Sequence, residues 1–177
     1  MKGYIQIYTG DGKGKTTASL GLTLRALGAG CSVFIGQFLK NGDYSEIRML
    51  KKMANILDEG QKLKVRQYGE PRFVGQTPRP EDLESARRGW VEIREAALSG
   101  RYDVVVMEEI NVALHLNLIP LEEVLALLAE KPEETELVLT GRYAPAELRE
   151  AADLVSEITE EKHYYQQGVP ARTGIEK

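Results

Sequence analysis

The stretch Tyr8–Leu22 reads YTGDGKGKTTASLGL and directly follows the apolar run YIQI. Residues 14–16 form the Gly-Lys-Thr end of a phosphate-binding loop. In such loops successive backbone N–H groups converge on an anion, and the following helix adds the positive end of its dipole. We therefore predict a strand up to Thr9, a phosphate-binding turn, and a helix from Thr16 to about Leu27.

The loop departs from the usual pattern at its first position. The motif G-x-x-x-x-G-K-[ST] has a glycine where this chain has Thr9. Gly10, Gly12 and Gly14 can still supply the dihedral freedom and the close approach that phosphates need. The alternative is a glycine-rich strand-to-helix turn with incidental lysines. The position of the loop between an expected strand and an expected helix favours nucleotide binding.

Two acids follow another apolar run. The segment DVVVMEE ends in Glu108 and Glu109, and the carboxyl ends of parallel strands form the ligand edge of a sheet. One of these glutamates could hold Mg²⁺ together with the Thr16 hydroxyl, while the other orients a group or caps the next helix. The sequence does not assign the two roles. The competing interpretation is a pair of solvated acids at a strand end.

Two basic residues complete this part of the prediction. Lys15 is placed to neutralise phosphate charge. Arg142 follows the apolar run LVLT, at the same expected edge, and either reaches phosphates or forms a surface ion pair. Both possibilities for Arg142 stay open at this point.

Apolar strands alternate with helical segments along the whole chain. Three helices are expected to open at prolines, namely Pro80, Pro120 and Pro145. In the helix that follows the phosphate loop, Leu20, Leu24 and Leu27 are expected to share one side. The pattern predicts an α/β fold, a mostly parallel sheet flanked by helices with phosphate-loop NTPase (RecA-like) architecture. We expect one domain over residues 1–177, with an irregular tail from about residue 163.

The composition restricts the possible partners. The net charge is -4, so no overall basic field indicates nucleic acid binding. No apolar run approaches the roughly 20 residues of a membrane span, and no signal peptide precedes the first expected strand. The single cysteine, Cys31, cannot form an internal disulfide. These features predict a cytoplasmic protein that binds neither nucleic acid nor a membrane.

Several segments together resemble the phosphate-loop ATP:corrinoid adenosyltransferases, also called cob(I)alamin adenosyltransferases. They are YTGDGKGKTTA, GQFLK, DVVVMEEINVAL, LTGRYAP, ADLVSEI and KHYYQQGVPARTGIE, which run from Tyr8 to Glu176. A threonine in place of the first loop glycine is a trait of that family, so Thr9 supports the resemblance.

The resemblance implies a particular chemistry. A reduced Co(I) corrinoid would attack the 5′-carbon of ATP, form a cobalt–carbon bond and release triphosphate, with ATP held in reverse of its usual direction in such loops. It also implies Mg²⁺, a reductant or flavoprotein that supplies Co(I), and a homodimer. The catalytic residues would be Lys15, Glu108 and Glu109, and the metal ligands Thr16 with Glu108 or Glu109. Nucleotide binding would fall to Arg142 and the loop residues Thr9, Gly10, Asp11, Gly12, Lys13, Gly14, Lys15, Thr16 and Thr17.

On the corrinoid side, the resemblance points to EPRFVGQTP, where Phe73 is the aromatic residue. Family members use such a segment to shape the space beneath the corrin and to disfavour the lower cobalt ligand. The main alternative for the chain as a whole is a phosphate-loop kinase or ATP hydrolase that acts on the phosphate chain. A non-catalytic nucleotide-binding module is the third possibility.

Overall fold

The computed structural model describes residues 2–72 and 77–177, and it contains a six-stranded sheet. The strand order is β3-β2-β4-β5-β1-β6, and every pairing is parallel. The strands are β1 (Ile5–Thr9), β2 (Val33–Phe38), β3 (Leu63–Tyr68), β4 (Val104–Glu108), β5 (Glu136–Thr140) and β6 (Leu154–Glu157). The predicted parallel α/β architecture is therefore confirmed.

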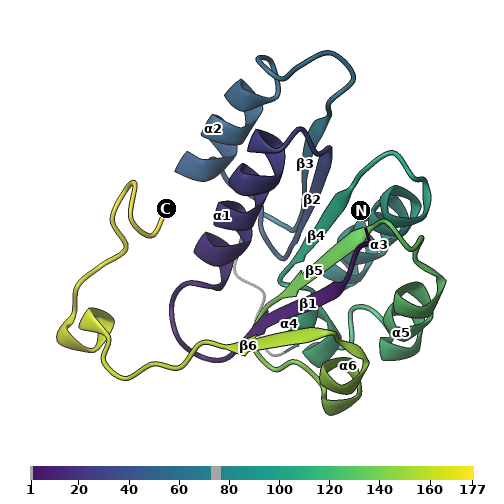
Figure 1. Cartoon of the computed structure of the whole chain (residues 1–177). Coiled ribbons are helices and arrows are strands. Elements are labelled where there is room, and N and C mark those ends of the chain that lie inside the picture. The colour runs from purple at the N-terminus through teal and green to yellow at the C-terminus, as the bar shows by residue number, and fades with distance from the viewer. Residues whose placement is uncertain (1, 73–76) are drawn as a thin grey trace.

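Helices cover both faces of this sheet (Figure 1). On one face lie α1 (Lys15–Gly28) and α2 (Ser45–Met53). On the other lie α3 (Pro80–Leu98), α4 (Ile110–His115), α5 (Leu121–Glu130) and α6 (Ala146–Ala151). As predicted, Pro80 begins α3, while Pro120 and Pro145 immediately precede α5 and α6.

Alternate residues of the central strands enter two separate hydrophobic cores. In β2, Phe34 packs with the α3 side of the sheet and Ile35 with the α1 side. In β4, Val105 and Val106 divide in the same way. Because both faces are covered, nearly every position of these strands must be apolar, which explains their continuous hydrophobic runs.

The leucines of α1 are buried to different extents. Leu27 is buried, but Leu20 is only partly buried and Leu24 is 60% exposed. The face turned to the sheet instead carries small residues, Ser19, Thr23 and Ala26 among them, which allow the helix to approach the strands closely. The leucines share one side of α1 by their spacing, but the buried face is rotated from that side toward these small residues.

The chain beyond β6 has little regular structure. It contains the short 3₁₀ helix η1 (Tyr164–Gln167) and otherwise runs irregularly to Lys177. Figure 1 shows that this segment leaves the sheet at β6 and ends beside α1 and α2. Within residues 2–72 and 77–177, no helix combines the length and apolar character that crossing a membrane requires.

The edge strand β6 leads into a segment that supports the phosphate loop. The Gly12 N–H donates to the Ile158 carbonyl oxygen at 2.7 Å. A Cβ at Gly12 would lie 2.5 Å from the Thr159 carbonyl oxygen. The loop backbone therefore touches the backbone that follows β6, and only glycine leaves room for that approach.

We predict that Gly12→Ala destabilises the fold by about 1–3 kcal/mol, because the added methyl group must displace backbone rather than a movable side chain. Urea denaturation followed by circular dichroism measures the change. Gly28→Ala is the matched control, since a Cβ there meets open space at the end of α1. It should be neutral or stabilise the protein by up to about 1 kcal/mol. Equal stability of the two variants would contradict this account of the loop.

Candidate functional site

The phosphate loop lies between β1 and α1, at the carboxyl edge of the sheet. Thr9 is the last residue of β1, is 2% exposed, and its hydroxyl accepts a hydrogen bond from the Ala144 N–H at 3.4 Å. Left-handed backbone begins only at Gly10, with φ of 94°. A glycine is therefore not needed at position 9, because that residue is still part of the strand.

Lys15 lies at the centre of the loop. Its Nζ donates to the carbonyl oxygens of Gly10 at 2.6 Å and Gly12 at 2.8 Å, and the residue is only 9% exposed. Burial, and then the neighbouring Arg142 charge, lower the pKa of Lys15. A positive charge is thus held against two carbonyl oxygens of the loop, next to the backbone that would bind an anion.

Glu108 is fully buried and accepts three side-chain donors. The Thr16 hydroxyl and the Lys40 ammonium both donate to Oε1, the latter at 2.5 Å, while the Gln37 amide donates to Oε2. Gln37 is itself held by the Gln67 amide at 3.0 Å. The carboxylate therefore has a fixed orientation, with Oε1 directed at the first turn of α1.

Glu109 has a different environment from its neighbour. Its φ is 60°, a left-handed conformation, and its N–H donates to the Thr140 hydroxyl at 3.2 Å. This turn directs the partly buried Glu109 into the cleft that the phosphate loop also lines. Burial raises the pKa of Glu109; Lys40 opposes that effect and Glu108 reinforces it. Of the two acids, Glu108 is the one in contact with Thr16.

Arg142 lies on the other side of the loop. Its Nη2 donates to the Asp11 carbonyl oxygen at 3.1 Å, and its Nε lies 3.8 Å from the Asp11 carboxylate. Gly141 and Tyr143 on either side of it have φ of 127° and 64°. The structure therefore brings Arg142 to the loop in a solvent-exposed ion pair, at the rim of the same cleft.

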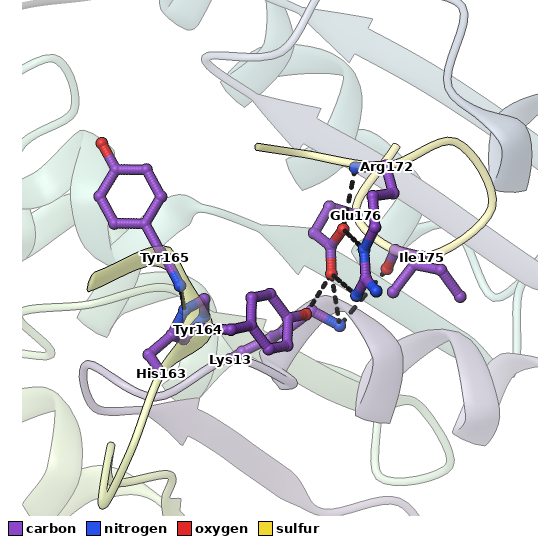
Figure 2. Close-up of polar contacts among 7 residues, drawn as sticks. All are labelled: Lys13, His163, Tyr164, Tyr165, Arg172, Ile175 and Glu176. Atoms are coloured by element: carbon purple, nitrogen blue, oxygen red, sulfur yellow. Dashed lines mark hydrogen bonds and ion pairs between the residues drawn. The ribbon is translucent and has the colours of Figure 1, made fainter. Parts of the chain in front are cut away.

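The C-terminal tail returns to the loop through Glu176 (Figure 2). Its carboxylate accepts hydrogen bonds from the Tyr164 hydroxyl and from Arg172, and lies 3.7 Å from the Lys13 ammonium. The hydrogen bonds from Arg172 and Tyr164 lower the pKa of Glu176 to about 2. Glu176 therefore carries a negative charge beside the phosphate loop at neutral pH.

Two further contacts attach the last residues of the chain. Lys13 Nζ donates to the Ile175 carbonyl oxygen at 3.3 Å, and the Ser45 hydroxyl donates to the Lys177 carbonyl oxygen at 3.1 Å. The tail thus bridges the loop and the start of α2, and forms one wall of a cleft of about 950 Å³. The tail residues Glu160 and His163 also line the cleft. The rest of its lining is Asp11 to Thr17, the α1 residues Leu20, Gly21 and Leu24, and Lys40, Tyr44, Ser45, Glu46, Glu109 and Arg142.

The oxygen donors at Thr16 and Glu108 suit Mg²⁺. This ion prefers hard oxygen ligands and is usually held by one or two protein groups together with substrate phosphates. In the part of the chain that the structure describes, no group of three or more His, Cys, Asp or Glu side chains could form a complete metal site. A hydroxyl and a single carboxylate beside a phosphate loop are consistent with a metal that arrives with the nucleotide.

The structure describes the tryptophan of this chain but not the aromatic residue predicted for the corrinoid side. Phe73, expected on the corrinoid side, lies outside the described residues. Trp90 is 1% exposed in the core, and its indole N–H donates to Glu123 of α5 at 2.6 Å. The tryptophan of this chain therefore packs α3 against α5.

Sequence reasoning missed Gln37, Lys40, Ser45 and Glu176 as parts of the site. A signal was available for Lys40, which follows the apolar strand in GQFLK as directly as the two acids follow theirs. The same rule for the carboxyl edge of a parallel sheet applies to both positions. The contacts of Glu176 gave no local signal, because they depend on the path of the tail.

The family model described as ATP:corrinoid adenosyltransferase BtuR/CobO/CobP matches residues 1–176. The corrinoid adenosyltransferase of Escherichia coli strain K12 is 33% identical over 181 positions, covering 99% of this chain and 86% of that protein. The corrinoid adenosyltransferase of Sinorhizobium sp. is 35% identical over 184 positions, covering 99% and 80%.

A Nostoc protein, all2391, is 35% identical over 182 positions that cover 97% of this chain but 47% of that protein, so the chain spans about half its length. Among solved structures, the RadB recombinase superposes with a TM-score of 0.53 at 13% identity, covering 92% of this chain and 77% of that one. This likeness supports the RecA-like phosphate-loop fold. Because the family model matches residues 1–176, nearly the whole chain, the chain belongs to the ATP:corrinoid adenosyltransferase family.

Proposed function

We propose that this chain transfers the 5′-deoxyadenosyl group of ATP to the Co(I) of a corrinoid and releases triphosphate. The observation that carries the proposal is the cationic phosphate site, with Lys15 buried at its centre, in a chain of this family. Such a site suits a reaction whose leaving group is a polyanion.

The reaction needs little acid–base chemistry from the protein. The electron pair comes from Co(I) of the substrate; the new bond joins cobalt to the 5′-carbon, and the broken bond is that between this carbon and the triphosphate oxygen. The bonding electrons leave with the triphosphate. The protein must therefore position the two substrates and stabilise negative charge on the leaving group. No side chain has to act as the nucleophile.

The phosphate loop and the residues around it would stabilise the leaving group in three ways. The amides of the loop and the Lys15 ammonium would bind the triphosphate oxygens. Lys13 and Arg142 line the cleft and can add positive charge from its two sides. In this structure Lys13 is paired with Glu176, and Arg142 with Asp11. Thr16 and Glu108 would hold Mg²⁺, which supplies further neutralisation of the phosphates when it is bound.

The proposal includes partners and surroundings. A reductant or flavoprotein would supply Co(I), because the corrinoid must arrive reduced for the attack on carbon. We also propose that the chain works in the cytoplasm as a single domain and assembles as a homodimer, a state that sedimentation would measure.

The first prediction from the proposed function concerns the products. Incubation with MgATP and chemically reduced cobalamin should yield equal amounts of alkylated corrinoid and triphosphate, because the 5′-carbon is the point of attack. Corrinoid spectra and phosphate chromatography measure both products. Formation of ADP, with no change in the corrinoid, would instead identify a kinase or ATP hydrolase and overturn the proposal.

The second prediction concerns Lys15. Lys15→Ala should lower kcat by about 10²–10³-fold, the usual cost of losing one preorganised group that stabilises developing negative charge. Lys62→Ala is the matched control: it removes the same charge from an exposed residue just before the amino end of β3. Its turnover should equal that of the wild type. Wild-type turnover in a folded Lys15→Ala protein would contradict the assigned role.

The third prediction concerns Phe73 and rests on the family resemblance alone. Phe73→Ala should reduce turnover of complete cobalamin more than turnover of a corrinoid that lacks the lower base, since only the former has a lower ligand to disfavour. Rates on the two substrates under saturating MgATP give the comparison. Equal losses on both would remove Phe73 from this role.

A further inference from the structure

Lys40 lies between the two groups that the proposed function assigns to the metal. Its Nζ is 2.5 Å from Glu108 Oε1 and 3.3 Å from the Thr16 hydroxyl oxygen. An ammonium group and a metal ion cannot both occupy this position, because each requires the same oxygen atoms and each carries positive charge.

Among the described groups that contact Glu108, the Lys40 ammonium has the most freedom to leave the carboxylate. Glu108 is fully buried, and the Gln37 amide that fixes its other oxygen is also fully buried. The Lys40 side chain is 20% exposed and lines the nucleotide cleft. A flexible four-carbon stem allows its ammonium to swing into that cleft while the backbone stays in place.

The backbone that carries Lys40 has an unusual conformation. Leu39 has φ of 60°, which is unfavourable for a residue with a side chain, and its N–H donates to the Tyr68 carbonyl oxygen at 3.1 Å. A Cβ at Gly69 would lie 2.5 Å from the Lys40 nitrogen. The end of β2 is therefore bent and held against the end of β3, and this bend accompanies the approach of Lys40 to Glu108. Strained backbone of this kind concentrates at functional sites.

We propose that Lys40 is a positioning residue. Its ammonium group neutralises Glu108 until the magnesium nucleotide binds, and then moves into the cleft to pair with the triphosphate. The inference rests on the proposed function in one respect, namely that Thr16 and Glu108 hold the metal. Lys40 thereby opposes metal binding without nucleotide and favours it with nucleotide. A lysine that served only the fold would not weaken metal binding without nucleotide and strengthen it with nucleotide.

The test measures Mn²⁺ binding by electron paramagnetic resonance, first without a polyanion and then with inorganic triphosphate. Without triphosphate, Lys40→Met should bind Mn²⁺ roughly tenfold more tightly than the wild type, the scale of one charge-assisted hydrogen bond. With triphosphate, the same variant should bind the Mn²⁺–triphosphate complex several-fold more weakly. Unchanged or weaker Mn²⁺ binding without triphosphate would overturn the inference.

Two matched variants test whether the effect on Mn²⁺ affinity requires a positive charge at Glu108 or any positive charge in the cleft. Lys40→Arg keeps a cation within reach of Glu108, so its Mn²⁺ affinity without triphosphate should stay close to that of the wild type. Lys13→Met also removes one charge from the cleft, but the partner of Lys13 is Glu176 in the tail. It should likewise leave that affinity unchanged, and tightening as large as that of Lys40→Met would overturn the specific role of Lys40.

Glu108→Gln distinguishes failure of the inference from failure of the metal site. If this variant binds Mn²⁺ as the wild type does, the assignment of Glu108 to the metal is wrong and the inference falls with it. If Glu108→Gln loses Mn²⁺ binding while Lys40→Met gains none, only the inference about Lys40 is wrong.

Should Lys40→Met fail to fold, acetylation of lysines in the wild type gives an independent measurement. Saturating Mn²⁺ alone should increase labelling of Lys40, because its ammonium would be released from Glu108. Unchanged labelling would overturn the inference.

Discussion

The site depends on one buried negative charge, the carboxylate of Glu108. Glu108 has no exposed surface, and an unpaired carboxylate in such a place would be strongly destabilising. The structure satisfies it with donors from three places: Thr16 at the start of α1, Gln37 within β2, and Lys40 just after β2. These contacts tie the helix behind the phosphate loop to two central strands. The position of the loop therefore depends on the same carboxylate that is proposed to receive the metal.

The turns that present this site have an unusual backbone. Leu39, Glu109 and Tyr143 all have φ of 60–64°, and they follow β2, β4 and β5 in that order. These strands are neighbours in the sheet, so the three turns lie along one stretch of its carboxyl edge. Each turn redirects the chain sharply and brings Lys40, Glu109 or Arg142 to the cleft. Left-handed conformations cost energy for residues with side chains, and the packed sheet is what maintains them.

The sequence predicted the features that follow from repeated local patterns. Alternating apolar strands and helices indicated the parallel sheet, and Gly-Lys-Thr indicated the loop. It did not distinguish Glu108 from Glu109, because the difference arises from the left-handed turn at Glu109, which no residue type dictates there. The leucine spacing also did not indicate which side of α1 is buried, because close packing of small residues against the sheet determines that side. The contact of Glu176 with Lys13 joins residues far apart in the chain, so no local pattern announces it.

The cationic groups expected to meet a triphosphate already have partners before any nucleotide is considered. Lys15 is held by loop carbonyls, Lys13 by Glu176, and Arg142 by Asp11. Binding of a triphosphate is therefore an exchange of partners rather than the addition of an anion to free cations. The affinity is the difference between two sets of interactions, so the cleft can hold a polyanion firmly enough for reaction without binding it irreversibly. The pairs at Asp11 and Glu176 are partly exposed and individually weak. The buried pair at Glu108 is the costly one to exchange, so the proposed replacement of Lys40 by a divalent ion would couple metal binding to nucleotide binding.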